Sequence, residues 1–345
     1  MRSETEFYDL QAAARVGALG KLPSDALTPE RLIARNPAGN TPLHTAAKYG
    51  HLRDVPVKAL TTQTLTVKND AGYTPLHHAA LGGHLNQIPA ELLVADLLDL
   101  RSNAGFTVYH VAAAHGHLAQ IPAGLLTTDV MLRKTDVGNT LLHEAAEQGT
   151  LHRIPTEFLT AANLSHKNVG GETVLHVAAF NGHLDQVPRP LLTAAALLEA
   201  TTAGDTVFHA AAISGHLEQI PPGLLTRNHL VVASKTGFTA IHAAAETGQL
   251  GKIPYDQLTA ELLLTRNDNG DTPLHAAAFE GHLDQVPPAL LTAENVATRN
   301  YDGLSVAQTA LDRGHLEQIP VGVRPQSLSP LRRFLRRLSN TKAPF

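Results

Sequence analysis

The chain has 345 residues, of which 43% are hydrophobic and 17% charged, and its formal net charge is −4 at pH 7. It contains no cysteine, which excludes disulfide bonds and thiolate metal sites. The N-terminal stretch lacks the apolar core of a signal peptide, and no apolar run reaches the length of a membrane span. We therefore expect a soluble, cytoplasmic protein, with secretion into a host cell left open.

The sequence repeats itself every 33 residues from one end to the other. A glycine recurs at Gly39, Gly72, Gly105, Gly138, Gly171, Gly204, Gly237, Gly270 and Gly303, and a proline recurs from Pro23 to Pro320 at the same interval. This gives ten repeats without an insertion. Self-similarity at such a period is the signature of a stacked array, in which each repeat buries surface only against its neighbours.

The first half of a typical repeat, TPLHTAAKYG at residues 41–50, predicts a short helix. Thr41 suits the N-cap, and Pro42 suits the first helical position, where its missing N–H costs nothing. The following Leu and Ala residues share one helical face, and alanine lets neighbouring helices approach closely. Gly50 can adopt the left-handed conformation that ends a helix.

The second half of the repeat predicts a broken helix. A second helix should begin at about His51, but Pro56 follows after one turn and would cost roughly 3 kcal/mol inside a helix. The proline can instead open a new turn, and a Thr such as Thr259 followed by an acid resembles another N-cap. We therefore expect one ordinary helix per repeat and an outer layer of short helical turns.

The two ends of the array depart from this pattern, as expected of repeats with one side facing water. We predict an all-α solenoid with a capping repeat at 1–38, eight repeats over 39–302, a second capping repeat at 303–323 and a basic amphipathic tail at 324–345.

The repeat resembles the ankyrin repeat. The resemblance is carried by TPLH at residues 41–44 and 272–275, the Ala-Ala pair, the GHL triplet, the turn glycine and the 33-residue spacing, and it covers roughly residues 7–322. It departs from the family in the QIPxxLLT stretch, where an ankyrin repeat has an unbroken second helix. The resemblance implies that the repeated histidines are structural and that partners bind the face formed by the turns and first helices.

No motif in the sequence indicates catalysis, a metal or a cofactor. We find no phosphate-binding loop, dinucleotide fingerprint or metalloprotease helix, and the Asp and His of GHLDQ recur once per repeat, as scaffold residues do. We therefore expect no enzyme activity, no cofactor and no small-molecule substrate. The regular, cysteine-free array favours a bacterial source.

The positions that vary between repeats are the candidates for partner binding. They follow the turn glycine or the Ala-Ala pair, and several carry large apolar side chains, which are favoured interface anchors. An alternative interpretation is that several fold down against neighbouring repeats. The candidates are Tyr49, Tyr73, Phe106, Phe180, Ile213, Phe238 and Phe279. We expect a monomeric scaffold that binds another protein.

The tail supports a second hypothesis. Residues 324–345 carry six basic residues and no acid, and in SLSPLRRFLRRLSN the apolar residues share one face of a helix. The tail could cap the last repeat, or it could bind an anionic membrane or nucleic acid with the repeats as a spacer. The arginines concerned are Arg332, Arg333, Arg336 and Arg337.

Overall fold

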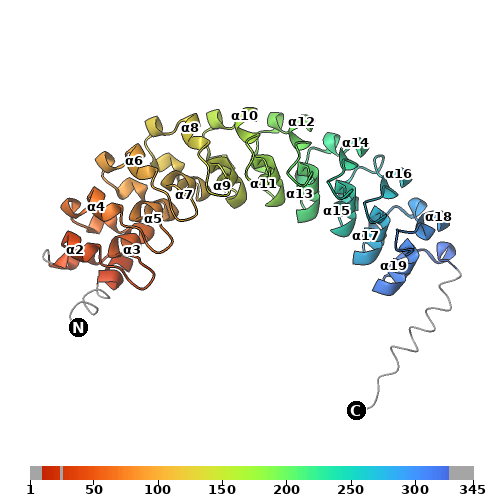
Figure 1. The fold of residues 1–345 in the computed structure, drawn as a ribbon, viewed down its shortest axis with the longest axis horizontal. Coiled ribbons are helices and arrows are strands. Elements are labelled where there is room, and N and C mark those ends of the chain that lie inside the picture. The colour runs from red at the N-terminus through yellow and green to blue at the C-terminus, as the bar shows by residue number, and fades with distance from the viewer. Residues whose placement is uncertain (1–9, 24–25, 326–345) are drawn as a thin grey trace, which may run out of the picture. The chain divides into compact units, whose positions relative to one another are not determined.

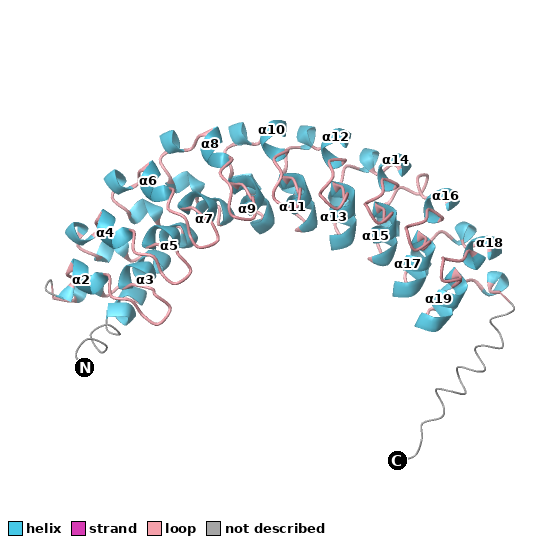
Figure 2. Cartoon of the chain, in the orientation of Figure 1, coloured by secondary structure: helices cyan, strands magenta, loops and turns pink. Residues whose placement is uncertain are grey.

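A computed structural model describes residues 10–23 and 26–325 (Figure 1). The chain divides into two compact units. Unit 1 comprises Met1–Leu191 and unit 2 comprises Leu192–Phe345. The described residues are helical except for loops and four isolated β-bridges, such as the bridge between Lys167 and Thr173 (Figure 2). The all-α prediction is therefore confirmed.

The first helix of each repeat is seven or eight residues long. In unit 1 these helices are α3 (Pro42–Tyr49), α5 (Pro75–Gly82), α7 (Val108–Ala114), α9 (Leu141–Gln148) and α11 (Val174–Phe180). In unit 2 they are α13 (Val207–Ser214), α15 (Ala240–Glu246), α17 (Pro273–Glu280) and α19 (Val306–Arg313). Residues 10–15 are also helical.

A second layer of four- or five-residue α-helices accompanies the first (Figure 1). In unit 1 it consists of α2 (Pro29–Leu32), α4 (Thr62–Leu65), α6 (Ala95–Leu98), α8 (Thr128–Met131) and α10 (Ala161–Leu164). In unit 2 it consists of α12 (Ala194–Leu197), α14 (Arg227–Leu230), α16 (Ala260–Leu263) and α18 (Ala293–Ala297).

Short 3₁₀ helices connect the two layers. The first set is η1 (Leu19–Lys21), η3 (Leu52–Asp54), η5 (Leu85–Gln87), η7 (Leu118–Gln120), η9 (Leu151–Arg153), η11 (Leu184–Gln186), η13 (Leu217–Gln219), η15 (Leu250–Lys252), η16 (Leu283–Gln285) and η18 (Leu316–Gln318). The second set is η4 (Val57–Ala59), η6 (Ala90–Leu92), η8 (Ala123–Leu125), η10 (Thr156–Phe158), η12 (Arg189–Leu191), η14 (Pro222–Leu224), η17 (Pro288–Leu290) and η19 (Val321–Val323).

Within each unit, every first helix packs on the next one along the chain. In unit 1 the order of contacts is α3, α5, α7, α9 and α11, and in unit 2 it is α13, α15, α17 and α19. The Ala-Ala pairs lie in these interfaces, and Ala46 and Ala79 are fully buried. Short side chains allow this close contact, and the core of each unit is thus a row of nearest-neighbour interfaces.

The proline breaks the second helix as predicted. After Gly83, η5 ends at an extended Ile88, and Pro89 has φ −53° and ψ 132°, outside the helical region. A new 3₁₀ turn follows, and then a Thr caps the outer helix; the Thr127 hydroxyl, for example, accepts a hydrogen bond from the Val130 N–H. Proline removes the donor that a continuous helix needs at this point.

The GHLxQ motif joins each repeat to the one before it. The Gln87 side chain accepts a hydrogen bond from the Leu52 N–H (3.0 Å) and donates one to the Gly50 carbonyl (2.8 Å). The ring of His84 lies under the same glycine, where a Cβ atom would come within 2.8 Å of Cε1. Gln120 and Gln318 make the same pair of bonds in their repeats. The motif therefore binds one helix C-terminus to the next repeat.

Gly149→Ala should destabilise unit 1 by about 1–2 kcal/mol, because residue 149 has a left-handed φ of 70° and its Cβ would lie 2.7 Å from the His183 ring. Gly124→Ala is the matched control, since its Cβ meets nothing within 4 Å and its φ is not left-handed. Its effect should stay within about 1 kcal/mol. Urea unfolding of both variants tests this, and equal losses would show that the glycine cap is not a constraint.

Candidate functional site

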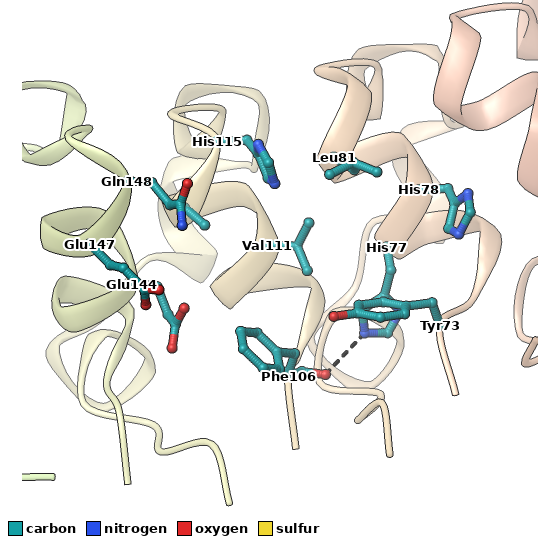
Figure 3. A pocket seen from close by; sticks show the side chains of 11 residues that line it. Tyr73, His77, His78, Leu81, Phe106, Val111, His115, Glu144, Glu147 and Gln148 are labelled. Carbon is teal, nitrogen blue, oxygen red and sulfur yellow. Dashed lines mark hydrogen bonds between the residues drawn. The ribbon is translucent and has the colours of Figure 1, made fainter. Parts of the chain in front are cut away.

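The repeated TPLH histidines are hydrogen-bonded at both ring nitrogens. His77 Nδ1 accepts a bond from the Thr74 N–H (3.1 Å), and its Nε2 lies 3.1 Å from the Phe106 carbonyl of the next repeat (Figure 3). Because the first bond makes Nδ1 an acceptor, Nε2 must carry the proton. His44, His143, His209, His242 and His275 make the same two kinds of contact. These rings bond cap and turn groups, as the sequence predicts.

Burial keeps these imidazoles neutral. It lowers the pKa of His44 to about 3 and the pKa of His77, His110 and His143 to about 4. Burial also lowers the pKa of His209, His242 and His275, but the carboxylates of Asp205 and Asp271 act in the opposite direction. The histidines are therefore poor candidates for proton transfer near neutral pH.

The candidate residues that follow the turn glycine are half-buried. Tyr73 packs edge-on against His77, with ring centroids 5.2 Å apart, and Phe106 packs against His110 at 6.1 Å. Phe238 lies 5.4 Å from His242, with the two rings tilted by 32°. Each ring thus packs against a histidine of its own repeat and stays partly accessible.

The candidates near the C-terminal ends of the first helices are more exposed. Phe180 on α11 is 54% exposed and Ile213 on α13 is 45% exposed. Cations lie over two other candidates: Arg15 and Lys48 are within 6 Å of the Tyr49 ring, and the Arg313 guanidinium is 3.4 Å from the Phe279 ring. Of the seven candidates, Phe180 and Ile213 therefore present the largest apolar surface without a cation over it.

Unit 1 has a pocket of about 440 Å³ between α5, α7 and α9 (Figure 3). Tyr73 and Phe106 form its aromatic wall, and α9 contributes an acidic wall. Leu81, Val111 and Ala114 supply its apolar surface. The remaining lining residues are His77, His78, His115, Glu144, Glu147 and Gln148. We call this the unit 1 pocket.

Glu144 is the unusual group in this pocket. It is only 4% exposed, and its Oε1 accepts one hydrogen bond, from Asn139 Nδ2 (3.0 Å). Asn139 is held in turn by Asn168, whose Nδ2 donates to Asn139 Oδ1 (3.0 Å). Burial, reinforced by the nearby Glu147, raises the pKa of Glu144 to about 7. A buried carboxyl on an accessible pocket wall is typical of a binding or reactive site.

Unit 2 has a second pocket, of about 350 Å³, on its corresponding first helices α15, α17 and α19. Phe238 and Phe279 line it together with Leu304. Four acids also line it: Glu246, Asp271, Glu280 and Asp302. In each unit, therefore, a pocket on the turns and first helices combines aromatic and acidic side chains.

Two segments of the sequence match family models. The family model for ankyrin repeats in three copies matches residues 12–89, and the single ankyrin-repeat model matches residues 269–301. The chain therefore carries ankyrin repeats in both units. No curated protein matches it in sequence.

The sequence interpretation missed two polar residues that make the unit 1 pocket distinctive. Both follow a TPLH-type histidine, a position where the other repeats carry Thr, Val or Ala: Thr45, Val111, Val177, Ala210, Ala243, Ala276 and Thr309. His78 and Glu144 break that pattern. Comparing this position between repeats would have revealed them. The buried Nδ1 of His78 also has no hydrogen-bond partner among the described residues.

Among residues 10–23 and 26–325, no cluster of three or more His, Asp or Glu residues is placed to hold a metal ion. No helix in the described part of the chain has the length and apolar character needed to cross a bilayer. The tail arginines Arg332, Arg333, Arg336 and Arg337 lie outside the described residues.

Glu144→Gln should stabilise the protein at pH 8. The pKa of Glu144 is 4.5 in the unfolded chain and about 7 in the folded protein. The stability that this difference contributes is therefore complete below pH 4.5 and is lost as the pH rises through 7. At pH 8 the buried charge costs on the order of 1–3 kcal/mol, and Gln keeps an acceptor for Asn139 without that charge.

Urea unfolding at pH 8 and pH 6 measures this difference. The stabilisation by Glu144→Gln should be smaller at pH 6, and the exposed Glu147→Gln should have little effect at either pH. A destabilised Glu144→Gln variant at pH 8 would contradict the assignment of a costly buried carboxylate.

Proposed function

We propose that this protein is a non-catalytic scaffold that binds another protein through its turns and first helices. Ankyrin repeats are generally protein–protein interaction modules, and the chain carries them in both units. The observation that carries the proposal is the exposure of Phe180, a phenylalanine at the last position of α11 with 54% of its surface accessible. Large exposed aromatic side chains are favoured anchors in interfaces.

Two further features support the proposal. The candidate positions vary from repeat to repeat while the capping Thr, the histidine and the glycines recur, as expected of a constant framework that carries a specific surface. Both pockets lie on the turns and first helices of their units and have the mixed apolar and polar lining of recognition sites.

Photocrosslinking tests the proposed surface. A benzophenone amino acid placed at Phe180 or at Ile213 should give a specific crosslink to a protein of the source organism. The same label at Tyr255 is the control, because Tyr255 is an aromatic residue that is even more exposed (74%) and follows Pro254 in the second half of its repeat. Crosslinks from Tyr255 alone would exclude the proposed surface.

A further inference from the structure

The unit 1 pocket combines features that fit a positively charged ligand group. Its acidic wall carries Glu144 and Glu147 from one face of α9, and its aromatic wall carries Phe106, drawn beside Glu144, and Tyr73 beyond it (Figure 3). Neither lysine nor arginine lines it among the described residues. Its two outer histidines are held neutral, because burial lowers the pKa of His78 to about 4 and also lowers that of His115. The net charge of the lining is therefore negative.

Glu144 is prepared to receive a hydrogen-bond donor. The bond from Asn139 fixes Oε1. Oε2 makes no hydrogen bond among the described residues and is not one of their fully buried unpaired atoms, so it remains accessible. A buried carboxylate with an unused oxygen is unfavourable by itself and becomes favourable when a cation donates to it. No other repeat places an acid at this position, so Glu144 does not belong to the common framework. A residue that departs from the framework and lowers stability is expected at a functional site.

We propose that the unit 1 pocket binds a single arginine side chain of the partner protein. The planar guanidinium stacks on the rings of Tyr73 and Phe106 and donates hydrogen bonds to Glu144, with Glu147 as an outer countercharge. Arginine fits better than lysine, because its flat, weakly hydrated head group matches an aromatic wall and a carboxylate together. The pocket volume of about 440 Å³ lies within the range of small ligand sites.

This inference deepens the proposed function by giving the chemistry of one partner residue. It can be tested without the partner, using N-acetyl-arginine N-methylamide as the probe and the full chain with labelled Leu and Val methyl groups. The lining residues Leu81 and Val111 report binding by NMR. The probe should shift both signals to saturation. The citrulline analogue, which has nearly the same shape without the charge, should not.

Two variants and one control locate the site. Glu144→Gln should weaken binding of the probe at least tenfold, and a thermal unfolding experiment should show that the variant is folded. Phe106→Ala should also weaken binding of the probe, because it removes one of the two rings of the aromatic wall. Glu246→Gln in unit 2 is the matched control, because residue 246 occupies the same repeat position as Glu147, and it should leave the Val111 shifts unchanged.

Binding should also depend on pH, because the probe recognises the carboxylate form of Glu144. With a pKa of about 7 in the free protein, the affinity at pH 8 should be about tenfold higher than at pH 6, and Glu144→Gln should remove this dependence. The other titratable groups in the surrounding wall and turns are Tyr73, His77, His78, His115, Glu147 and Glu172.

Three results would overturn the arginine assignment: no saturable shift, equal shifts from the citrulline analogue, or unchanged binding by a folded Glu144→Gln variant. None of these results would affect the crosslinks from Phe180 and Ile213, so the proposed binding surface would still be supported. Conversely, crosslinks from Tyr255 alone would remove that surface and leave a confirmed arginine site in place.

Discussion

Acid should unfold unit 1 near pH 5. Its histidines His44, His77, His78, His110 and His143 have pKa values of about 3 to 4 when folded, compared with 6.5 in the unfolded chain. Below pH 6.5 the unfolded chain therefore binds more protons than the folded chain. The free energy of unfolding is unaffected by these histidines above that pH and decreases as the pH falls below it. Each histidine contributes a loss of about 1.4 kcal/mol per pH unit, so the five together remove about 10 kcal/mol by pH 5. That loss is comparable with the total stability of a typical domain. Glu144, whose pKa is raised, acts in the opposite direction but is a single group.

Unit 2 should resist acid better than unit 1. Asp205 and Asp271 follow turn glycines in unit 2, and their carboxylates raise the pKa values of His209, His242 and His275. Among the described residues of unit 1 only Glu172, which follows Gly171, acts in this way, and it acts on His143. The residues that follow Gly39, Gly72, Gly105 and Gly138 are Asn, Tyr or Phe. Circular dichroism at 222 nm between pH 8 and pH 3 gives the transitions, and hydrogen-exchange labelling assigns each to a unit. Asp271→Asn keeps an acceptor for Asn300 Nδ2 but removes the charge, so it should move the unit 2 transition to higher pH. A single transition below pH 3.5 would contradict the assignment of buried neutral histidines.

Leu142→Ala should cost about 2–5 kcal/mol, because Leu142 is fully buried on α9 and its removal leaves a cavity in the core of unit 1. Contacts are between nearest neighbours, so the loss of hydrogen-exchange protection should concentrate in α7, α9 and α11. Leu304→Ala is the control, since Leu304 is 41% exposed and should cost much less. Loss of protection spread evenly over unit 2 as well would contradict nearest-neighbour packing.

Local signals made most of the fold predictable. The capping Thr41, Pro42 and the C-terminal Gly50 each act within one helix, so their roles can be derived from a single repeat, and the capping bonds confirm them. The proline effect is equally local: Pro89 cannot continue a helix in any environment. Between repeats the sequence was less informative. Gln87 recurs in the motif, but its bonds reach residues 35 and 37 positions away, and nothing in one repeat reveals that partner.

The candidate site was predictable only in part. Tyr73 and Phe106 were found because they vary within a constant framework, and both line the unit 1 pocket. Their packing against His77 and His110 depends on ring geometry that the sequence does not encode locally. Glu144 was missed because three repeats must be assembled before it becomes a buried acid beside an aromatic wall.

The affinity of the crosslinked partner for two single variants tests the proposed binding surface most directly. Phe180→Ala removes an exposed anchor from the first-helix layer, and Tyr255→Ala removes a more exposed aromatic side chain from the second half of a repeat. We predict that Phe180→Ala raises the Kd of the partner by about tenfold or more, because an interface anchor is lost. Tyr255→Ala should leave the Kd unchanged. An unchanged Kd for Phe180→Ala, together with a raised Kd for Tyr255→Ala, would contradict the proposed surface.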